Sequence, residues 1–281
     1  MQKIALITDS ACDLDLNTLK ENNINLLPLR IIYSNGDYRD RIDISPQEVY
    51  DNLEKEVPKT SLPSAQDTEE TLNRLEEEGY THVIYISISS GLSGSFNAIR
   101  LALEDHPKLT SFVYDSKILA YPQGEIVLEV AKLIKEGTSF EEIVKEISDI
   151  RKRIIGYFTI NTLEYLKKGG RIGRLAGTVG ELLNLKPIIT TDEDGVFYNV
   201  VKVRGRKQSL SKMTELLKGY LAKGKCEVAV LHAGCEDEAI KYMNSLKDLT
   251  NVVSIKIAEI SPSLGIHGGP GLMGFSVKMV K

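Results

Sequence analysis

Residues 81–97 read THVIYISISSGLSGSFN, and this stretch decides the fold. Its first half is an almost unbroken apolar run rich in isoleucine and valine, typical of a strand buried on both faces. Small residues fill positions 89–95, and residues 96–104 continue as a helix. A buried strand that leads through a short turn into a helix indicates a parallel sheet whose faces are covered by helices.

The same alternation is expected on both sides of this stretch. We expect strands at 3–7, 24–33 and 111–114. We expect helices from Asp13 or Asp15 to about 22, from Ser64 to 78, and at 124–136 and 139–153. Residues 34–59 are polar and carry few helix signals. The sequence thus predicts an α/β domain over 1–154, with a mostly parallel sheet and helices on both faces.

The pattern changes after residue 154. We expect strands at 155–160, 226–232, 252–258 and 273–280, with short helices at 161–168 and 178–185 and two further helices between the later strands. Residues 188–203 are expected to form two strands joined at Asp194-Gly195, a hairpin turn pair. These elements predict a second α/β domain over 155–281 with a mixed sheet.

Composition restricts the function classes. Apolar residues make up 42% and charged residues 26% of the 281 residues, as in ordinary globular proteins. The net charge of −4 gives no reason to expect nucleic acid or an anionic membrane as partner. No stretch reaches the roughly 18 apolar residues of a membrane helix. Three cysteines without CxxC spacing argue against zinc and disulfides, and a cytoplasmic location is expected.

The Ser/Gly-rich turn at 89–95 is the first candidate site. It lies where ligands bind in open parallel sheets, and free N–H groups at a helix start favour an anion. Gly91 and Gly94 would let the backbone approach a ligand, and Ser93 and Ser95 would add hydroxyls. The alternative is an ordinary tight turn with helix-capping serines, and the sequence leaves both open.

Two further segments carry polar groups. Thr60 and Ser61 belong to a second hydroxyl-rich turn, and His267 lies in the glycine-rich stretch 265–274. That stretch contains the letters GxGxxG, but only seven residues follow it, too few for the helix of a dinucleotide site. A serine hydrolase using Ser93 and His267 stays an alternative, although GLSGS is not the GxSxG motif. A binder of a small phosphorylated metabolite is the third hypothesis.

Several motifs together resemble the DegV family of bacterial fatty-acid-binding proteins. They occur in family order over essentially the whole chain: Thr8-Asp-Ser10, Thr60-Ser-Leu-Pro63, Ser90-Gly-Leu-Ser-Gly-Ser95, Asp115-Ser116, Leu166-Lys-Lys-Gly-Gly-Arg-Ile172, Leu185-Lys-Pro187 and His267-Gly-Gly-Pro-Gly271. Leu62 departs from the family, which commonly has Gln there.

The resemblance implies one long-chain, palmitate-like fatty acid and no cofactor, metal or catalytic residue. Its carboxylate would be held by Thr60, Ser93 and His267, to which we add Ser61 and Gly94, and its tail would lie between the two domains. We expect Leu163, Leu166, Leu182 and Leu183 to wall part of the tail pocket. The alternative for these leucines is ordinary core.

The resemblance also implies, for some members, a non-enzymatic subunit that presents the lipid to a separate ATP-dependent kinase. Basic residues cluster at 151–174 and 202–207 of this acidic chain. Such clusters favour docking of an acidic or nucleotide-loaded partner, although a solvated basic face is equally expected. Arg204 matches a family position implicated in kinase contact, and Arg171 is our second choice.

Overall fold

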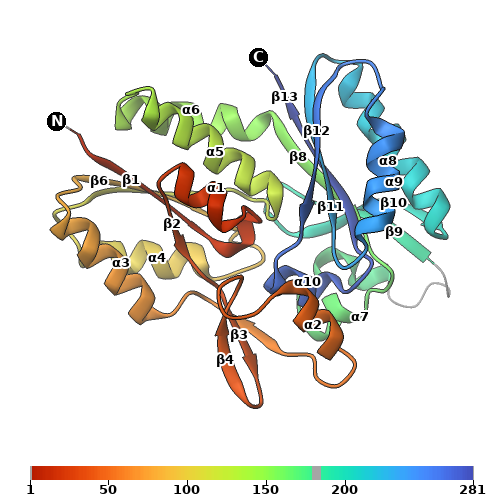
Figure 1. The fold of residues 1–281 in the computed structure, drawn as a ribbon, viewed down its shortest axis with the longest axis horizontal. Helices are drawn as coiled ribbons and strands as arrows, with labels where there is room; N and C mark the ends of the chain where they lie inside the picture. Colours follow the sequence, from red (N-terminus) through yellow and green to blue (C-terminus); the bar gives the residue numbers. More distant parts are fainter. Residues whose placement is uncertain (1, 179–184, 281) are drawn as a thin grey trace.

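The computed structural model describes residues 2–178 and 185–280, whose strands form three sheets (Figure 1). The first sheet has the order β2-β1-β6-β7 and is parallel throughout. Its strands are β1 (Ile4–Asp9), β2 (Ile24–Leu27), β6 (His82–Ser87) and β7 (Thr110–Asp115). The expected parallel sheet is therefore confirmed.

Helices cover both faces of this sheet because successive strand residues point to opposite sides. Ile7 and Tyr85 share a buried cluster with α3 (Ala65–Glu77) and α4 (Ser95–Glu104). Leu6 and Ile84 belong to the cluster that includes α5 (Tyr121–Lys135) and α6 (Phe140–Lys152). The short α1 (Leu16–Glu21) is capped by Asp15, whose side chain accepts from the Thr18 amide.

The second sheet is mixed, as expected, with the order β10-β9-β8-β13-β11-β12. Within it β11 and β12 run parallel and the other pairs run antiparallel. Helices α8 (Arg206–Leu221) and α9 (Glu236–Leu246) cover one face. The strands are β8 (Ile154–Thr159), β9 (Leu185–Thr191), β10 (Phe197–Arg204), β11 (Cys226–His232), β12 (Val252–Glu259) and β13 (Met273–Met279).

Helix α5 lies between the two large sheets. It contacts β1 and β6 on one side and β8 and β13 on the other. Consequently Gln123, Gly124 and Glu125 are buried along with its apolar residues. The Glu125 carboxylate accepts a hydrogen bond from the Ser276 hydroxyl of β13, which ties the helix to the second sheet.

The prediction of one strand over 24–33 is wrong. β2 ends at Leu27, and β3 (Arg30–Tyr33) belongs to a small antiparallel sheet with the order β4-β3-β5. Pro28 stands between them and has no N–H to continue a ladder, so the chain turns there into another sheet. The partners of β3 are β4 (Gly36–Arg39) and β5 (Lys59–Ser61).

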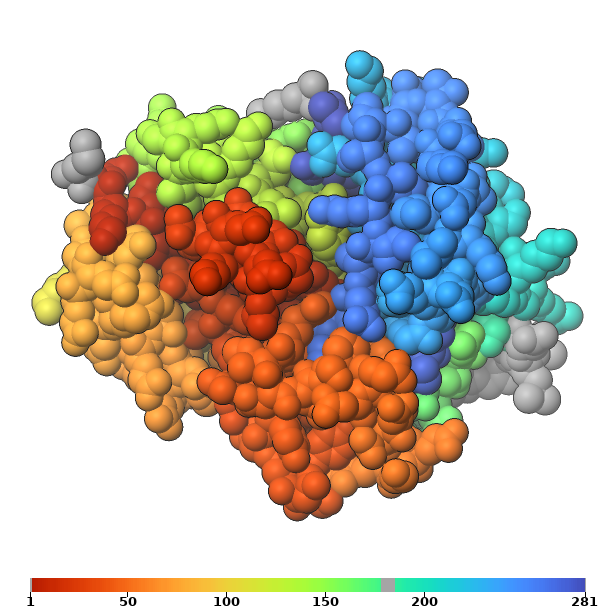
Figure 2. Space-filling view, in the orientation of Figure 1, coloured from red at the N-terminus to blue at the C-terminus, as the bar shows by residue number. Residues whose placement is uncertain are grey.

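The sequence analysis did not predict two of the helices in the described part of the chain. α2 (Pro46–Asn52) lies in the supposedly irregular 34–59 stretch and has a capping box formed by Ser45 and Glu48. α10 (Pro262–Gly268) runs into the glycine-rich stretch 265–274, for which no helix was expected. Both are short and contact each other. In Figure 2 the orange segment that contains α2 lies against both the red N-terminal part and the blue C-terminal part of the chain.

The region after β8 is only partly described. α7 (Glu164–Lys168) is where a helix was expected, and a 3₁₀ helix, η2, follows at Gly173–Thr178. The predicted helix 178–185 lies mostly outside the described residues, and Leu185 already belongs to β9. A domain boundary near residue 154 stays a prediction.

Glu125→Gln should stabilise the protein above neutral pH. Burial raises the pKa of Glu125 to about 7. The contribution of Glu125 to the free energy of unfolding is therefore fully present below about pH 4.5, and it is lost as the pH rises through 7. We expect the variant to gain on the order of 1–3 kcal/mol in unfolding free energy at pH 8 and little at pH 5, measured by urea unfolding.

Glu129→Gln is the matched control on the same helix. Burial opposes ionisation of Glu129, but its hydrogen bond to Lys278 and the positive charges of Lys278, Arg153 and Lys132 together outweigh this and hold its pKa below the usual value. This substitution should therefore destabilise at pH 8. Equal effects of Glu125→Gln at the two pH values would contradict the role given to burial.

Candidate functional site

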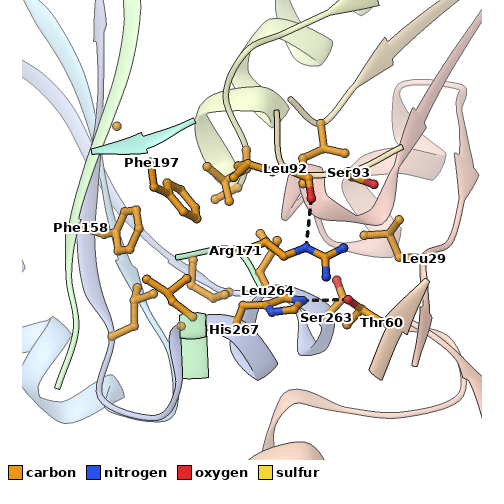
Figure 3. Close-up of a pocket in the computed structure, with 18 of the residues that line it drawn as sticks. Leu29, Thr60, Leu92, Ser93, Phe158, Arg171, Phe197, Ser263, Leu264 and His267 are labelled. Atoms are coloured by element: carbon orange, nitrogen blue, oxygen red, sulfur yellow. Dashed lines mark hydrogen bonds between the residues drawn. The ribbon is translucent and has the colours of Figure 1, made fainter. Parts of the chain in front are cut away.

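A cavity of about 280 Å³ lies where the loops after β6 and β7 meet the small sheet, α10 and the second large sheet (Figure 3). Its position at the carboxyl ends of parallel strands is the usual place for a ligand in an open α/β sheet. Most of the residues that line it are apolar. The polar side chains gather at one end, and Phe158 and Phe197 lie at the other.

The polar end brings together residues that are far apart in the sequence. The hydroxyls of Thr60, Ser61 and Ser93 line the cavity, and so does His267. All four residues were candidates for the carboxylate site in the sequence analysis. Gly94 is outside the lining and instead packs beside Leu62, whose Cδ2 would be 3.4 Å from a Cβ at that position. Arg171 and Ser263 complete the polar lining, and the sequence analysis had not placed either of them there.

The turn after β6 uses most of its own amides. The Leu92 and Ser93 N–H groups both donate to the Ser89 carbonyl, at 3.0 and 3.1 Å, and the Ser90 N–H donates to Asp115 at 3.0 Å. The Gly91 N–H donates to the Ser89 hydroxyl at 3.1 Å. The expectation of a row of free amides is therefore wrong for these residues, and the Ser93 hydroxyl is what the turn presents to the cavity.

Gly91 has a different role from the one expected. A Cβ at this position would lie 2.8 Å from the carbonyl oxygens of Asp194 and Gly195, in the turn between β9 and β10. The Ser89 hydroxyl donates to the same Gly195 carbonyl at 2.8 Å. The missing side chain thus lets the β9–β10 hairpin pack on the turn, rather than letting a ligand approach.

Thr60 and His267 face each other across the cavity mouth. Thr60 lies in β5, opposite Ile31 of β3, and His267 lies in the last turn of α10. Their side chains form a hydrogen bond of 2.8 Å between Oγ1 and Nε2 (Figure 3). The imidazole Nδ1 is buried against Gly169, where any Cβ would lie 2.1 Å away, and it has no hydrogen-bond partner among the described residues.

The imidazole of His267 is neutral at physiological pH. Burial, with a smaller contribution from the positive charge of Arg171, lowers its pKa to about 4. A neutral ring has one N–H donor, so Nε2 either donates to Thr60 or accepts from it. When Nε2 donates, the Thr60 hydroxyl proton is free for a ligand in the cavity.

Arg171 supplies the positive charge of the polar end. Its Nε donates to the Leu92 carbonyl at 3.2 Å and its Nη1 donates to the Gly169 carbonyl at 2.7 Å. Among the residues the structure describes, no carboxylate forms an ion pair with it. The guanidinium points toward Thr60 and Ser263 (Figure 3). A half-buried cation that pairs only with carbonyl groups favours an anion beside it.

The apolar wall draws on β8, β10 and β11 of the second large sheet and on the loops that follow β6 and β7 of the first. Leu166 of α7 lines the cavity, whereas Leu163 packs on the adjoining core and does not line it. Leu182 and Leu183 lie outside the described residues. The sequence analysis did not place the other apolar lining residues there: Leu29, Leu62, Ile88, Leu92, Leu119, Ala120, Pro122, Tyr157, Phe158, Phe197, Leu231, Ile260, Leu264 and Leu272.

Much of the basic cluster at 151–174 serves the fold. Arg151 donates to the Ser116 and Ile154 carbonyls, and Arg174 pairs with Asp192 and Asp194. In the second cluster Arg206 pairs with Glu238. Arg204 is exposed at the end of β10 and does not line the cavity.

The geometry argues against a Ser–His hydrolase. The Ser93 hydroxyl bonds the Ser95 hydroxyl at 2.9 Å, while His267 bonds Thr60.

Within the described part of the chain, no group of His, Cys, Asp and Glu side chains could hold a metal ion. Over the same residues, no helix is long and apolar enough to cross a bilayer.

Known proteins resemble the chain along its whole length. The model of the DegV family, described as uncharacterised, matches residues 3–279. A DegV domain-containing protein of Clostridium perfringens is 49% identical over 99% of both chains.

Solved structures agree with this match. DegV of Bacillus subtilis, a fatty acid binding protein, is 31% identical with a TM-score of 0.91 over all of both chains. A stearic acid-binding protein of Eubacterium ventriosum is 28% identical with a TM-score of 0.87, over 99% of this chain and 98% of that one. The chain belongs to the DegV family.

Proposed function

We propose that this protein binds one long-chain fatty acid in the cavity and presents its carboxyl group to a separate ATP-dependent kinase, in the cytoplasm. The single observation that carries the binding proposal is the division of the cavity into one polar end and a long apolar wall. The fatty acids bound by the relatives from Bacillus subtilis and Eubacterium ventriosum support the ligand class.

The polar end suits a carboxylate. Arg171 offers a charge, and the hydroxyls of Thr60 and Ser93 offer donors on either side of it. In the tautomer with its proton on Nε2, neutral His267 donates to Thr60 Oγ1, which leaves the Thr60 proton free for the ligand. A carboxylate bonded in this way gains roughly 1.5–3 kcal/mol for each charge-assisted hydrogen bond.

The tail supplies most of the affinity. Burying each methylene contributes about 0.8 kcal/mol, so a palmitate-like chain gains far more along the wall than at the head, before ordering costs are subtracted. The head group therefore sets orientation, and the carboxylate lies next to Arg171 while the tail end approaches Phe158 and Phe197. The same orientation keeps the carboxyl group within reach of a partner.

Arg171 is better assigned to the head group than to the kinase. It was our second choice for docking, but its guanidinium faces the cavity. Arg204 keeps the docking assignment because it is exposed and outside the lining. The protein itself needs no catalytic residue in this scheme, since the kinase supplies ATP and the transferred phosphoryl group.

The binding proposal is tested by native mass spectrometry of the purified protein followed by organic extraction. We expect an additional mass that matches one fatty acid of about palmitate size per chain. Protein that carries a phosphorylated metabolite, or that stays empty when offered fatty acids of several lengths, would contradict the proposal.

Thr60→Val and Ser93→Ala should each weaken binding of a fluorescent fatty acid by about 10- to 150-fold, because each removes one charge-assisted hydrogen bond to the carboxylate. Thr110→Val is the control: it is the same Thr-to-Val substitution at an exposed residue of β7, and it should have no effect on affinity. Unchanged affinity in both cavity variants would put the head group elsewhere. Turnover of an ester probe that is lost in Ser93→Ala would favour the hydrolase alternative.

Arg204→Ala should leave fatty-acid affinity unchanged and sharply reduce phosphorylation by a cognate kinase. The deficit should grow with salt, because exposed charge contacts are screened over about 8–10 Å at moderate ionic strength. Arg100→Ala removes an exposed arginine on α4 and is the control. Normal turnover with Arg204→Ala would show that these basic residues form only a solvated surface and do not dock the kinase.

A further inference from the structure

Asp40 is a fully buried carboxylate outside the cavity lining. Its Oδ2 accepts from the hydroxyls of Ser10 and Ser263, both at 2.6 Å, and its Oδ1 accepts from the Ser263 amide at 3.1 Å. A buried carboxylate is tolerated where such donors compensate its desolvation. These bonds join three segments that are distant in the sequence.

One branch of the network leads to Thr60. The Ser10 hydroxyl accepts from the Leu29 amide at 3.0 Å, and the Asp40 amide donates to the Leu29 carbonyl at 2.9 Å. Leu29 directly precedes β3, which pairs with β5 through Ile31 opposite Thr60. The carboxylate therefore fixes the start of the strand whose neighbour carries the first head-group hydroxyl.

The other branch leads to His267. Ser263 lies in the first turn of α10, and His267 follows one turn later. A second buried carboxylate, Asp13, accepts from the Ser261 amide at 2.9 Å and pairs with Arg41 at 3.2 Å. Two aspartates thus hold the amides of Ser261 and Ser263, on either side of Pro262, at the start of this short helix, where acidic groups are favoured.

The backbone around these carboxylates is in an unfavourable conformation. Asp13 and Arg41 have φ values of 53° and 64°, in the left-handed region that side chains other than glycine rarely adopt. Arg41 Nη2 also donates to the Glu259 carbonyl at 2.7 Å, which closes the link to the strand before α10. Such strain persists where surrounding bonds impose it, and it is concentrated at functional sites.

We propose that Asp40 is a positioning residue, which fixes the strand pair that carries Thr60 relative to the helix that carries His267. The inference rests on the proposed fatty-acid site, since the 2.8 Å bond between those two side chains is what Asp40 maintains. Asp40 does not line the cavity. Its partner Ser263 and, through Ser10, Leu29 lie at the polar end of the cavity beside Thr60 (Figure 3), so we expect its influence on the carboxyl head of the ligand rather than on the tail.

The test measures binding of palmitate and of hexadecanol, which share a tail and differ at the head. Asp40→Asn keeps the size of the side chain but replaces one acceptor oxygen by an NH₂ donor, so the Ser10 and Ser263 hydroxyls cannot both donate as before. We expect palmitate affinity to fall about 5- to 10-fold and hexadecanol affinity to change less than about two-fold.

Glu125→Gln is the matched control, since it neutralises another buried carboxylate that also accepts from a serine, away from the cavity. It should leave the ratio of the two affinities unchanged. A coupled pair of variants gives a second readout: in a His267→Ala background, adding Asp40→Asn should cost little further palmitate affinity. Ser10→Ala removes only the branch toward Leu29 and replaces Asp40→Asn if that variant does not fold.

Equal losses for palmitate and hexadecanol, or an unchanged ratio in both Asp40→Asn and Ser10→Ala, would overturn the inference. Full additivity of Asp40→Asn and His267→Ala would also overturn it. If the wild-type protein binds neither palmitate nor hexadecanol, the proposed function is wrong, and the inference that rests on it is wrong as well.

Discussion

The burial of α5 on two sides is the constraint on which the rest of the structure depends. A helix with one apolar stripe covers one sheet, but α5 touches both large sheets and must bury its polar residues as well. Gln123 does so by donating to Thr8 and Asp9, and Glu125 by accepting from Ser276. The strands of the first sheet end near the start of this helix, where a Cβ at Gly156 of β8 would lie 2.6 Å from Pro122, and a cavity remains beside these elements. The cavity is thus a consequence of packing one helix between two sheets.

Buried polar groups near the cavity then divide into those that hold the loops and those that face the ligand. Asp9 is fully buried and accepts from the amides of Ala11 and Ile88, from Gln123 and from the Tyr85 hydroxyl. Burial raises the pKa of Asp9 to about 6, although these hydrogen bonds lower it. The desolvation of this carboxylate is the cost of fixing the end of β1 beside the end of β6. Since these groups satisfy one another, the side chains left to contact a ligand are few, and they come from other elements.

This division explains how far the sequence could predict the site. Regular βα alternation and side-chain caps such as Asp15 and Ser64 predicted the first sheet and its helices, because those patterns are local. The split of 24–33 at Pro28 and the short helix α10 depend on which sheet or helix receives the chain, and no local pattern records that. Arg171 was read as a surface residue for the same reason: the Lys-Gly-Gly-Arg turn indicates a bend, but only the approach of Leu92 and Gly169 turns its guanidinium into the cavity.

The charge balance at the polar end follows from these positions. Burial keeps His267 neutral, so Arg171 is the one formal charge among the described residues that line the cavity. Had the imidazole been charged as well, two cations would share a poorly solvated space, and their repulsion would have to be offset by folding energy. With a single guanidinium, held by two carbonyl groups and paired with no carboxylate in the described part of the chain, the site lacks one negative charge. A ligand with one carboxylate and a long apolar tail would supply that charge and fill the wall in the same binding event, so the head and the tail of the cavity favour the same class of molecule.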